Sequence, residues 1–352
     1  MTLLTQNIDS VLERSGVQQL PQHAGSRLTF RLAESAAAFE RALARGLEHW
    51  VVMFSGGKDS TTTLILALQH LEDERLKRLD VIYSDTQVEM PTLNDAVDAI
   101  LDQIPAAHPK IHVHRVRPEL KETFWVLIAG KGYPPPHNRF RWCTSKLKIK
   151  PAERKMAGLL LPGKSAILTG VRFGESDARD QRLNLSCARG GECGQGVWFE
   201  HSSVLNADYF GPIAAWRECD VWDFLDFVAP SLGYNTSSLR KAYVTANMRF
   251  GCWSCTVVRQ DKTINNLIKH NPSENLEALR DLRIWLMENA AIRENRVLRP
   301  SGATGRLSLS FRKKLLRKIL KVQRSIDAPI LSIEEVSLIR KLWKDAKYGD
   351  AY

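Results

Sequence analysis

The sequence has 352 residues, a formal net charge of +11 at neutral pH, and 44% hydrophobic residues. A chain of this length forms one large domain or two, and the hydrophobic content is ordinary for a globular protein in water. No stretch reaches the roughly 18 apolar residues of a membrane span, and no apolar run follows a basic start as in a secretory leader. We therefore expect a cytoplasmic protein with no membrane partner. The excess of cations predicts attraction to polyanions such as ATP, DNA or RNA, although a merely basic surface has the same composition.

The apolar pattern predicts an α/β fold with a Rossmann-like parallel sheet. A helix is expected from about Phe30 to Leu47, after which strands and helices alternate. This alternation is typical of a parallel sheet with helices on both faces, and such sheets bind ligands at the carboxyl ends of their strands. The expected strands are 49–54, 79–84, 110–116 and 165–171, and the expected helices are 59–71, 92–104, 119–129 and 145–160.

Three stretches interrupt the alternation. Gly130–Trp142 is rich in Pro, Gly and Arg, and Gly174–His201 is rich in Gly, so both predict loops. From about Lys262 to the end we expect helices. These boundaries suggest an N-terminal helical segment (1–48), a nucleotide-binding α/β domain (49–235) and a basic, helical C-terminal part (236–352).

A Ser-Gly-Gly-Lys-Asp-Ser turn joins the first expected strand to a helix. Backbone N–H groups and the helix dipole at such a turn favour an anion, and glycines let the backbone approach it. The spacing differs from that of a Walker A loop. The turn resembles the PP-loop of the ATP pyrophosphatases, which cleave ATP between the α and β phosphates; a glycine turn without a ligand is the alternative. The expected ATP-binding residues are Ser55, Gly56, Gly57, Lys58, Asp59 and Ser60, with Mg²⁺ beside them.

Two later motifs follow expected strands. Asp85 would hold Mg²⁺ or a ribose hydroxyl, or it is a turn aspartate; Gln87 stands where families with this loop have Gly. The segment Gly170–Arg179 resembles the Gly-x-Arg-x-x-[Glu/Gln]-Ser-x-x-Arg signature of the phosphoadenosine phosphosulfate (PAPS) reductase-like group. In that resemblance Gly170 lies at the nucleotide, Arg172 and Arg179 clamp phosphates and Glu175 orients one arginine, whereas the alternative is a surface ion-pair network.

A third motif, Pro212–Leu225, matches the Pro-Ile-x-x-Trp-x-x-x-Asp-Val-Trp marker of the same group. We interpret it as structural, with its apolar side chains in the core and Asp220 at a helix start. Cys219 within it is expected to be a buried small residue.

The cysteines form a second candidate site. Cys252 and Cys255 lie in a Cys-x-x-Cys turn that can hold one metal centre, and Cys143 lies at a lysine-rich helix start, which would lower its pKa. Four thiolates suit a [4Fe–4S] cluster or zinc. A redox disulfide or plain core thiols are the alternatives for Cys252 and Cys255. The fourth thiol would be Cys193 or Cys187, which otherwise form a persulfide relay pair or are inert.

The segments Arg141–Pro151, Arg249–Val258 and Gly305–Leu309, together with the Ser-Gly-Gly-Lys-Asp-Ser turn, resemble the DndC/SspD-like proteins of DNA phosphorothioation. The resemblance covers most of residues 49–325. It implies ATP-dependent adenylylation of a DNA backbone phosphate and its sulfuration, a [4Fe–4S] cluster, a cysteine desulfurase as sulfur donor and other DNA phosphorothioation proteins as partners. The implied catalytic residues are Lys58, Asp59, Cys143, Arg172 and Arg179, and the implied metal ligands are Cys143, Cys193, Cys252 and Cys255. The cysteine usual just before Arg249 is absent, which favours the SspD-like branch.

Three other functions share these motifs. A PAPS or APS reductase would reduce a small sulfonucleotide, but it would have a nucleophilic cysteine near its C-terminus, and none follows Cys255. A tRNA thiolase uses the same loop. A nucleotide-gated DNA-binding component of a defence complex would not need an intact Lys58 and Asp59.

The segment Arg312–Arg324 is a basic amphipathic pattern whose cations would follow a phosphate backbone. An ordinary packed helix with a solvated basic face is the favoured alternative for this segment. The same two alternatives apply to the cations of the proline-rich loop: they guide DNA to the site, or they are merely exposed. These cations are Lys131, Arg139 and Arg141.

Overall fold

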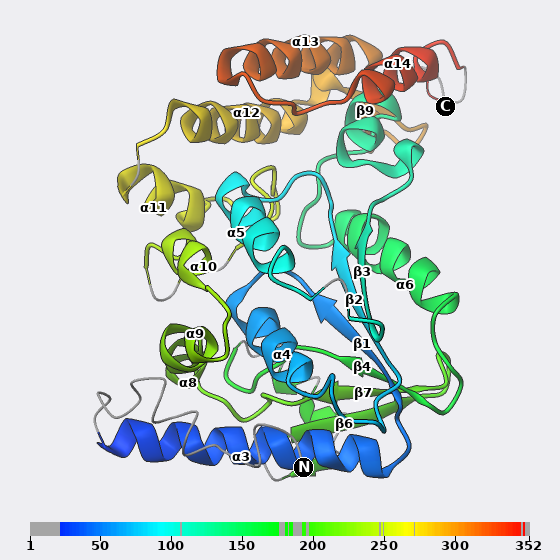
Figure 1. Cartoon of the computed structure of the whole chain (residues 1–352). Coiled ribbons are helices and arrows are strands. Elements are labelled where there is room, and N and C mark those ends of the chain that lie inside the picture. Colours follow the sequence, from blue (N-terminus) through cyan, green and yellow to red (C-terminus); the bar gives the residue numbers. More distant parts are fainter. Residues whose placement is uncertain are drawn as a thin grey trace. The chain divides into compact units, whose positions relative to one another are not determined.

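The computed structural model describes residues 22–105, 108–175, 180–181, 183–185, 192–194, 197–245, 248, 250–270, 272–345 and 348 (Figure 1). The chain divides into two compact units. We call residues up to Tyr83, Thr92–Arg115 and Lys155–Ala242 the sheet unit. The C-terminal unit comprises Ser84–Pro91, Val116–Arg154 and the chain from Tyr243 onward.

A seven-stranded sheet organises the sheet unit, in the order β3-β2-β1-β4-β7-β6-β5. Strand β1 pairs in parallel with β2 and β4, and β4 pairs in parallel with β7. Strands β5 and β6 extend this sheet in antiparallel pairs. The strands are β1 (His49–Phe54), β2 (Arg78–Ser84), β3 (Ile111–Val116), β4 (Ser165–Leu168), β5 (Glu192–Gly194), β6 (Val197–Ser202) and β7 (Ala207–Gly211).

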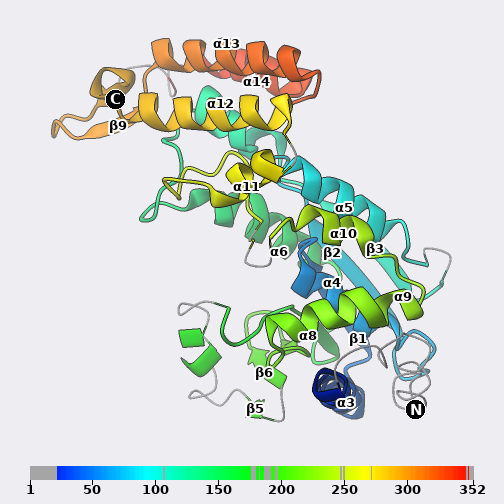
Figure 2. The same cartoon turned by 90° about the vertical axis from the view of Figure 1, so that its left-hand side faces the viewer.

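The centre of the sheet is apolar because β1 and β4 are covered on both faces. All four residues of β4 and five of the six in β1 are buried, and Phe39 of the N-terminal helix packs against Trp50 and Phe210. The helices of this unit include α3 (Gln22–Ala44), α4 (Lys58–Leu68), α5 (Pro91–Leu101), α8 (Glu218–Asp223), α9 (Ala229–Ser231) and α10 (Ser237–Ala242) (Figure 2). The predicted α/β fold with a largely parallel, Rossmann-like sheet is confirmed.

Two predicted helices differ in the structure. The segment 119–129 forms a short 3-10 turn, η2 (Leu120–Glu122), and a π-helical segment, η3 (Val126–Gly130). The segment 145–160 begins as a π-helix, η4 (Thr144–Ile149), and continues as α6 (Lys150–Ala157). An apolar pattern does not distinguish these helix types, because their turns differ by a single residue.

One buried polar ring stands out in the core of the sheet unit. His70 is 1% exposed, and its ring lies 4.5 Å from that of Phe39 and 5.3 Å from that of Trp50, measured between centroids. Neither ring nitrogen has a hydrogen-bond partner among the described residues. Burial therefore lowers the pKa of His70 to about 4, and the ring is neutral in the folded state.

We expect His70→Phe to make the protein more resistant to acid. In the wild type, His70 takes up a proton below about pH 6.5 when the chain is unfolded, but only below about pH 4 when it is folded. Protonation therefore favours the unfolded state between these values, and the free energy of unfolding decreases as pH falls from about 6.5 to about 4. The phenyl ring removes that loss, which amounts to about 3 kcal/mol at pH 4. Urea unfolding at about pH 7 and pH 4 measures it, with the exposed His112→Phe as control. An equal response of both variants to pH would contradict this account.

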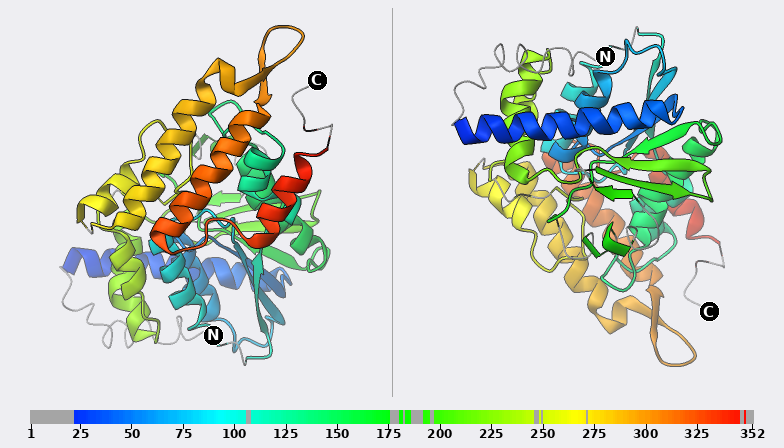
Figure 3. Two further views of the ribbon diagram at one scale, coloured as in Figure 1. Left: turned by 90° about the horizontal axis from the view of Figure 1, so that it is seen from above. Right: turned by 90° about the horizontal axis from the view of Figure 1, so that it is seen from below.

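The C-terminal unit consists of helices and one hairpin. Helices α12 (Glu274–Ala291) and α13 (Leu309–Ile326) lie side by side, and the chain between them extends from one end of the pair (Figure 3). This connection contains η6 (Arg293–Asn295) and an antiparallel pair, β8 (Arg296–Leu298) and β9 (Thr304–Leu307). The expectation of helices alone after Lys262 is therefore wrong at this hairpin. The remaining helices are α11 (Lys262–His270) and α14 (Ile333–Leu342).

Helix α13 is the predicted basic amphipathic helix. Its apolar face is buried, and Ser308 caps its start by accepting a hydrogen bond from the backbone N–H of Phe311 at 3.4 Å. Arg312 is also buried, where Nη1 donates to the Gly130 carbonyl at 2.6 Å and Nη2 donates to that of Tyr348. One of the expected phosphate-binding cations is thus a structural residue. None of the helices in the described part of the chain is long and apolar enough to cross a membrane.

Candidate functional site

The Ser55–Ser60 turn connects the carboxyl end of β1 to the first turn of α4. Gly57 is the N-cap residue, with φ −81° and ψ 162°, and no side chain caps the first N–H groups of the helix. The two serines hold the turn together: the Ser55 N–H donates to Ser60 Oγ at 3.2 Å, and Ser60 Oγ donates to the Gly57 carbonyl at 3.0 Å. This is the arrangement that a helix N-terminus needs to bind a phosphate.

Two glycines of the site are required by the backbone. Gly56 has φ +76°, and a Cβ atom there would lie 2.1 Å from Cγ2 of Val97. At Gly170, just after β4, the space for a side chain is already occupied by backbone. A Cβ atom there would lie 2.7 Å from the backbone carbon of Asp59 and 2.8 Å from the nitrogen of Ser60. The segment after β4 therefore touches the first turn of α4 backbone to backbone.

We expect Gly170→Ala to damage the loop without unfolding the protein. The added methyl group must displace the first turn of α4, at a cost of about 1–3 kcal/mol, and the displaced N–H groups no longer converge on a phosphate. Equilibrium binding of ATP should weaken by about tenfold or more, since each 1.4 kcal/mol is tenfold. Gly158→Ala is the matched control, because the nearest atom to its added Cβ is the Lys155 carbonyl oxygen at 3.8 Å. Unchanged ATP affinity in Gly170→Ala would disprove the role of this contact.

The charges of the site form one connected group. Lys58 is 6% exposed, with Nζ 3.3 Å from Asp59 Oδ2 and 3.5 Å from Glu218 Oε1. Asp59 also accepts a hydrogen bond from Nε of Arg172 at 2.5 Å. Lys58 and Asp59 come from α4, Arg172 follows β4 and Glu218 begins α8. The fold thus brings two cations and two carboxylates together at the carboxyl ends of β1 and β4.

Glu218 was not predicted as a site residue. The only sequence signal is its place beside Asp220 at a helix start, and that start is confirmed, because Asp220 Oδ2 accepts a hydrogen bond from the Arg217 N–H at 2.7 Å. The apolar residues of this motif are buried as expected. Cys219 is exposed, so the prediction that it is buried is wrong. As the second residue of α8, it is exposed beside buried Asp220, to whose Oδ1 its thiol donates at 3.9 Å.

Arg172 has a more structural place than its motif predicts. It is 4% exposed, and besides Asp59 it donates from Nη1 to the Trp216 carbonyl at 3.3 Å. It therefore holds Asp59 in position from within the fold. Glu175 is half-buried just beyond Gly174, which has φ +77°, and Arg179 lies outside the described residues.

Mg²⁺ is compatible with the donors of this site. The ion takes oxygen ligands and usually binds one or two protein carboxylates together with substrate phosphates and water. Asp59 and Glu218 supply two carboxylates, both within 3.5 Å of Lys58 Nζ. A nucleotide phosphate would compete with them for Lys58, and a divalent cation would offset the added negative charge.

Asp85 is a turn residue of the C-terminal unit. Its Oδ1 accepts from the Gln87 N–H at 3.0 Å, and its Oδ2 accepts from Arg117 Nε at 2.8 Å. Gln87 has φ +65°, the left-handed conformation that glycine adopts most readily. A positive φ at this position explains why glycine suits it. Contact of Asp85 with Mg²⁺ or ribose stays a prediction.

Three cysteines lie in the C-terminal unit. Cys252 and Cys255 are joined by a turn in which the Cys255 N–H donates to the Cys252 carbonyl at 3.0 Å. Arg283 of α12 donates from Nε to the Cys255 carbonyl at 2.5 Å. The backbone of Cys252 forms an isolated antiparallel β-bridge with that of Glu89. Cys143, Cys252 and Cys255 are free and half-buried. The turn is therefore firmly held. The alternative of a disulfide between Cys252 and Cys255 is not formed in this structure.

Two of these thiols, Cys143 and Cys252, favour the protonated form in this environment. Burial raises the pKa of Cys143 and raises that of Cys252 to about 12. The prediction that the helix start and nearby lysines make Cys143 a thiolate is thus wrong. Burial outweighs the cations because desolvation penalises the charged form directly.

The thiols only partly suit an iron–sulfur cluster. Their donor chemistry fits, and all three lie in the C-terminal unit. Among the described residues, however, no three His, Cys, Asp or Glu side chains converge as metal ligands. The geometry of this chain therefore does not form a cluster site from described residues alone. Cys193 lies in β5, and Cys187 is outside the described residues.

Comparison with protein families places the chain in one of them. The model of the phosphoadenosine phosphosulfate reductase domain matches residues 49–258, and the chain belongs to this family. This match includes the turn, the Gly170 segment and the Cys-x-x-Cys motif.

Individual relatives add little on function. "Uncharacterized protein MJ0066" of Methanocaldococcus jannaschii is 36% identical over 206 residues, which are 58% of this chain and 35% of that protein. "Uncharacterized protein MJ0973" of the same organism is 24% identical over 204 residues, 57% of this chain and 40% of that one. The chain thus spans about two fifths or less of these relatives. A phosphate complex of the PAPS reductase from Candida auris is 18% identical, with a TM-score of 0.36, over 58% of this chain and 81% of that one.

Proposed function

We propose that this protein is an ATP pyrophosphatase and sulfurtransferase that activates a DNA backbone phosphate for replacement of a non-bridging oxygen by sulfur. The uncapped first turn of α4, with buried Lys58 beside it, supports the ATP step most directly. The family supports nucleotide and sulfur chemistry in general. DNA as the acceptor rests on the resemblance of the cysteine segments to DndC/SspD-like proteins.

The nucleotide step uses residues of the sheet unit. The N–H groups of α4 and Lys58 bind the β and γ phosphates. Asp59 and Glu218 would hold Mg²⁺, which would offset the negative charge of the phosphates. Arg172 keeps Asp59 in place. A non-bridging oxygen of the acceptor phosphate attacks the α-phosphorus, the bond to the β-phosphate oxygen breaks, and pyrophosphate leaves. The acceptor now has AMP as its leaving group.

The sulfur step needs a donor protein. The terminal sulfur of a persulfide, supplied by a cysteine desulfurase, attacks the activated backbone phosphorus, and AMP leaves with the former backbone oxygen. A second thiol then cleaves the sulfur–sulfur bond, forms a disulfide with the carrier cysteine and leaves sulfur on phosphorus. Cys143 is the proposed carrier in this chain. Transfer also requires the other DNA phosphorothioation proteins as partners.

An iron–sulfur cluster on Cys143, Cys252, Cys255 and either Cys193 or Cys187 is a separate proposal, and no step above uses it. A cysteine that binds iron cannot carry persulfide at the same time, so the two roles of Cys143 exclude each other. Anaerobic purification followed by iron and sulfide analysis decides between them. Absence of iron and labile sulfide from the intact protein would end the cluster proposal.

Two measurements test the proposed function. The purified protein with ATP, Mg²⁺ and DNA should form AMP and pyrophosphate in equal amounts. Mass spectrometry of digested DNA and tRNA, from cells with and without the gene, should show phosphorothioate-linked dinucleotides lost from DNA alone. Loss of a thionucleoside from tRNA would replace the DNA assignment with tRNA thiolation. Reduction of PAPS to sulfite without use of ATP would instead identify a reductase.

A further inference from the structure

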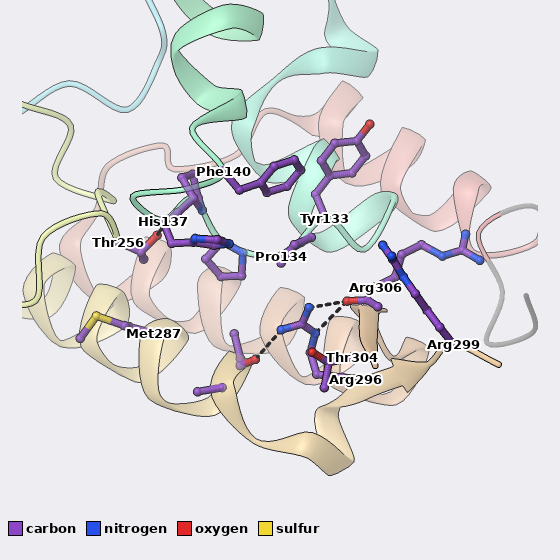
Figure 4. A pocket seen from close by; sticks show the side chains of 15 residues that line it. Tyr133, Pro134, His137, Phe140, Thr256, Met287, Arg296, Arg299, Thr304 and Arg306 are labelled. Atoms are coloured by element: carbon purple, nitrogen blue, oxygen red, sulfur yellow. Dashed lines mark hydrogen bonds between the residues drawn. The ribbon is translucent and has the colours of Figure 1, made fainter. Parts of the chain in front are cut away.

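A pocket of about 650 Å³ opens in the C-terminal unit, and no step above uses it (Figure 4). It lies between the proline-rich loop, the end of α12 and the β8–β9 hairpin. Its volume is in the range of pockets that hold one small organic molecule. None of the described residues that line it is acidic.

One side of the pocket presents aromatic rings. Tyr133, His137 and Phe140 come from the proline-rich loop, and Phe140 is 41% exposed, which is unusual for a phenyl ring. The rings of His137 and Phe140 lie 6.0 Å apart, and the Phe140 N–H donates to the His137 carbonyl at 2.8 Å. The backbone that carries these two rings is thus held in place before any ligand arrives.

The loop that presents these rings is rigid. It contains three consecutive prolines, Pro134–Pro136, each with a fixed φ. Thr256 is buried below it and donates from Oγ1 to the Pro136 carbonyl at 2.6 Å. A preformed site loses little conformational entropy on binding.

Arginines of the hairpin form the other side (Figure 4). Arg296 is structural, since Nε donates to the Gly305 carbonyl at 3.0 Å and Nη1 to that of Ala290 at 3.3 Å. Arg299 is exposed at the hairpin end, and its side chain makes no hydrogen bond or ion pair with the described residues. Its guanidinium group is therefore available to an external anion. Arg306 adds positive charge beside it.

We infer that this pocket binds one nucleotide of a single-stranded nucleic acid, with the base against Phe140 and His137 and its phosphate on Arg299. Stacking on exposed rings combined with guanidinium contacts to phosphate is how proteins bind single strands. A base within a duplex cannot enter such a pocket without leaving its stack. Arg139 and Arg141, both exposed on the same loop, provide positive charge for flanking phosphates. Binding stands on these residues alone; only its link to sulfur transfer rests on the proposed function.

Fluorescence anisotropy of the full chain with a labelled single-stranded DNA of roughly 16 nucleotides tests this inference. Phe140→Ala should weaken binding about 5- to 100-fold, and Phe140→Trp should retain it, because any aromatic face stacks. Arg299→Ala should reduce the slope of log affinity against log salt by about 0.7. Both residues are exposed, so these variants should fold as the wild type does.

Two variants serve as controls. Phe30→Ala removes another exposed phenyl ring, and Arg324→Ala removes an exposed cation of α13. Both should bind as the wild type does. Wild-type affinity in Phe140→Ala and Arg299→Ala, or loss in Arg324→Ala alone, would overturn the inference. Equal affinity for the duplex, or binding of free AMP without binding of the oligonucleotide, would do the same.

The same measurement with an RNA oligonucleotide shows whether the pocket prefers RNA or DNA. A preference for either nucleic acid supports the inference. ATP turnover, measured on the same samples, separates it from the proposed function. Loss of oligonucleotide binding in Phe140→Ala upholds the pocket even when no ATP is cleaved. Conversely, normal ATP cleavage together with wild-type binding in Phe140→Ala rejects the pocket and leaves the proposed enzyme intact.

Discussion

Lys58→Ala is expected to reduce the formation of AMP and pyrophosphate from ATP by about 100-fold or more. Lys58 is the first residue of α4 and is almost fully buried, and its Nζ lies 3.3 Å from Oδ2 of Asp59 in the first turn of the helix. Charge that develops on the leaving pyrophosphate meets a fixed cation there, and removing one such donor typically costs about 10²–10³ in rate. The effect should appear in kcat as well as KM, because the charge grows in the transition state.

The controls for Lys58→Ala distinguish the loss of its positive charge from a loss of folded structure. Removal of Lys58 leaves the carboxylates of Asp59 and Glu218 without their shared cation, so the variant must be shown to keep its circular dichroism spectrum. Lys58→Arg keeps the charge but alters its geometry, and we expect intermediate activity. Lys77→Ala, at an exposed lysine, should behave as the wild type does. Full turnover by Lys58→Ala would mean that the Ser55–Ser60 turn is not the ATP site.

The sequence was sufficient to predict the parts of this site that follow from local physics. A buried run such as β1 followed by Gly-Gly and a helix pattern has few conformations, and β1 has the bounds that were expected. The positive φ of Gly56 belongs to the same local turn. The role of Asp85 as a turn residue is also predictable, as one of two alternatives, because an aspartate side chain commonly accepts a hydrogen bond from the N–H two residues later, here that of Gln87.

Other features depended on contacts between distant segments. Gly170 matters because the chain after β4 touches the backbone of α4, some hundred residues earlier, and nothing near Gly170 in sequence indicates that contact. Glu218 faces Lys58 only because α8 packs beside α4. The raised pKa of Cys143 has a similar cause. Lysines near this cysteine can be recognised in the sequence, whereas the burial that raises its pKa is a property of the folded unit.

The pocket of the C-terminal unit shows the same limit. The proline-rich loop of this pocket is predictable from its prolines, and its lysine and arginines are candidates for binding DNA. The β8–β9 hairpin is not predictable, because strands of three and four residues contain too little alternation of polar and apolar residues. The sequence therefore places the arginines of this hairpin in a helical region. Without that hairpin, the rings of the proline-rich loop have no opposing charge, and no pocket can be predicted.

Asp80→Asn is expected to destabilise the sheet unit by about 3 kcal/mol, which is typical of a buried ion pair that loses one partner. Asp80 lies in β2 with no exposure. Its carboxylate accepts from His49 Nε2 at 2.7 Å, Arg78 Nε at 2.6 Å and His114 Nε2 at 2.6 Å. An amide in its place has no charge and one oxygen instead of two, so at least one of these donors is left without its partner.

The effect of Asp80→Asn should depend on pH in a defined direction. Burial alone would raise the pKa of Asp80, but hydrogen bonds from His49, Arg78 and His114 together lower it far below its ordinary value. A lowered folded-state pKa stabilises the protein above the unfolded value of about 3.9, and this contribution is lost as pH falls further. The difference between wild type and variant should therefore be full near neutral pH and shrink below about pH 4.

Hydrogen exchange of peptides from β1 and β2 is the appropriate measurement, because it reports the stability of the sheet itself in a chain of two units. Asp80→Asn should accelerate exchange in these strands by about 100-fold, the equivalent of about 3 kcal/mol, provided that the amides exchange through global opening. The exposed Asp102→Asn should leave it unchanged. If both variants exchange alike, the three side chains around Asp80 do not stabilise the sheet. A sheet that opens more readily also releases the β1–α4 turn, so Asp80→Asn should lower ATP turnover only at temperatures where exchange is already fast.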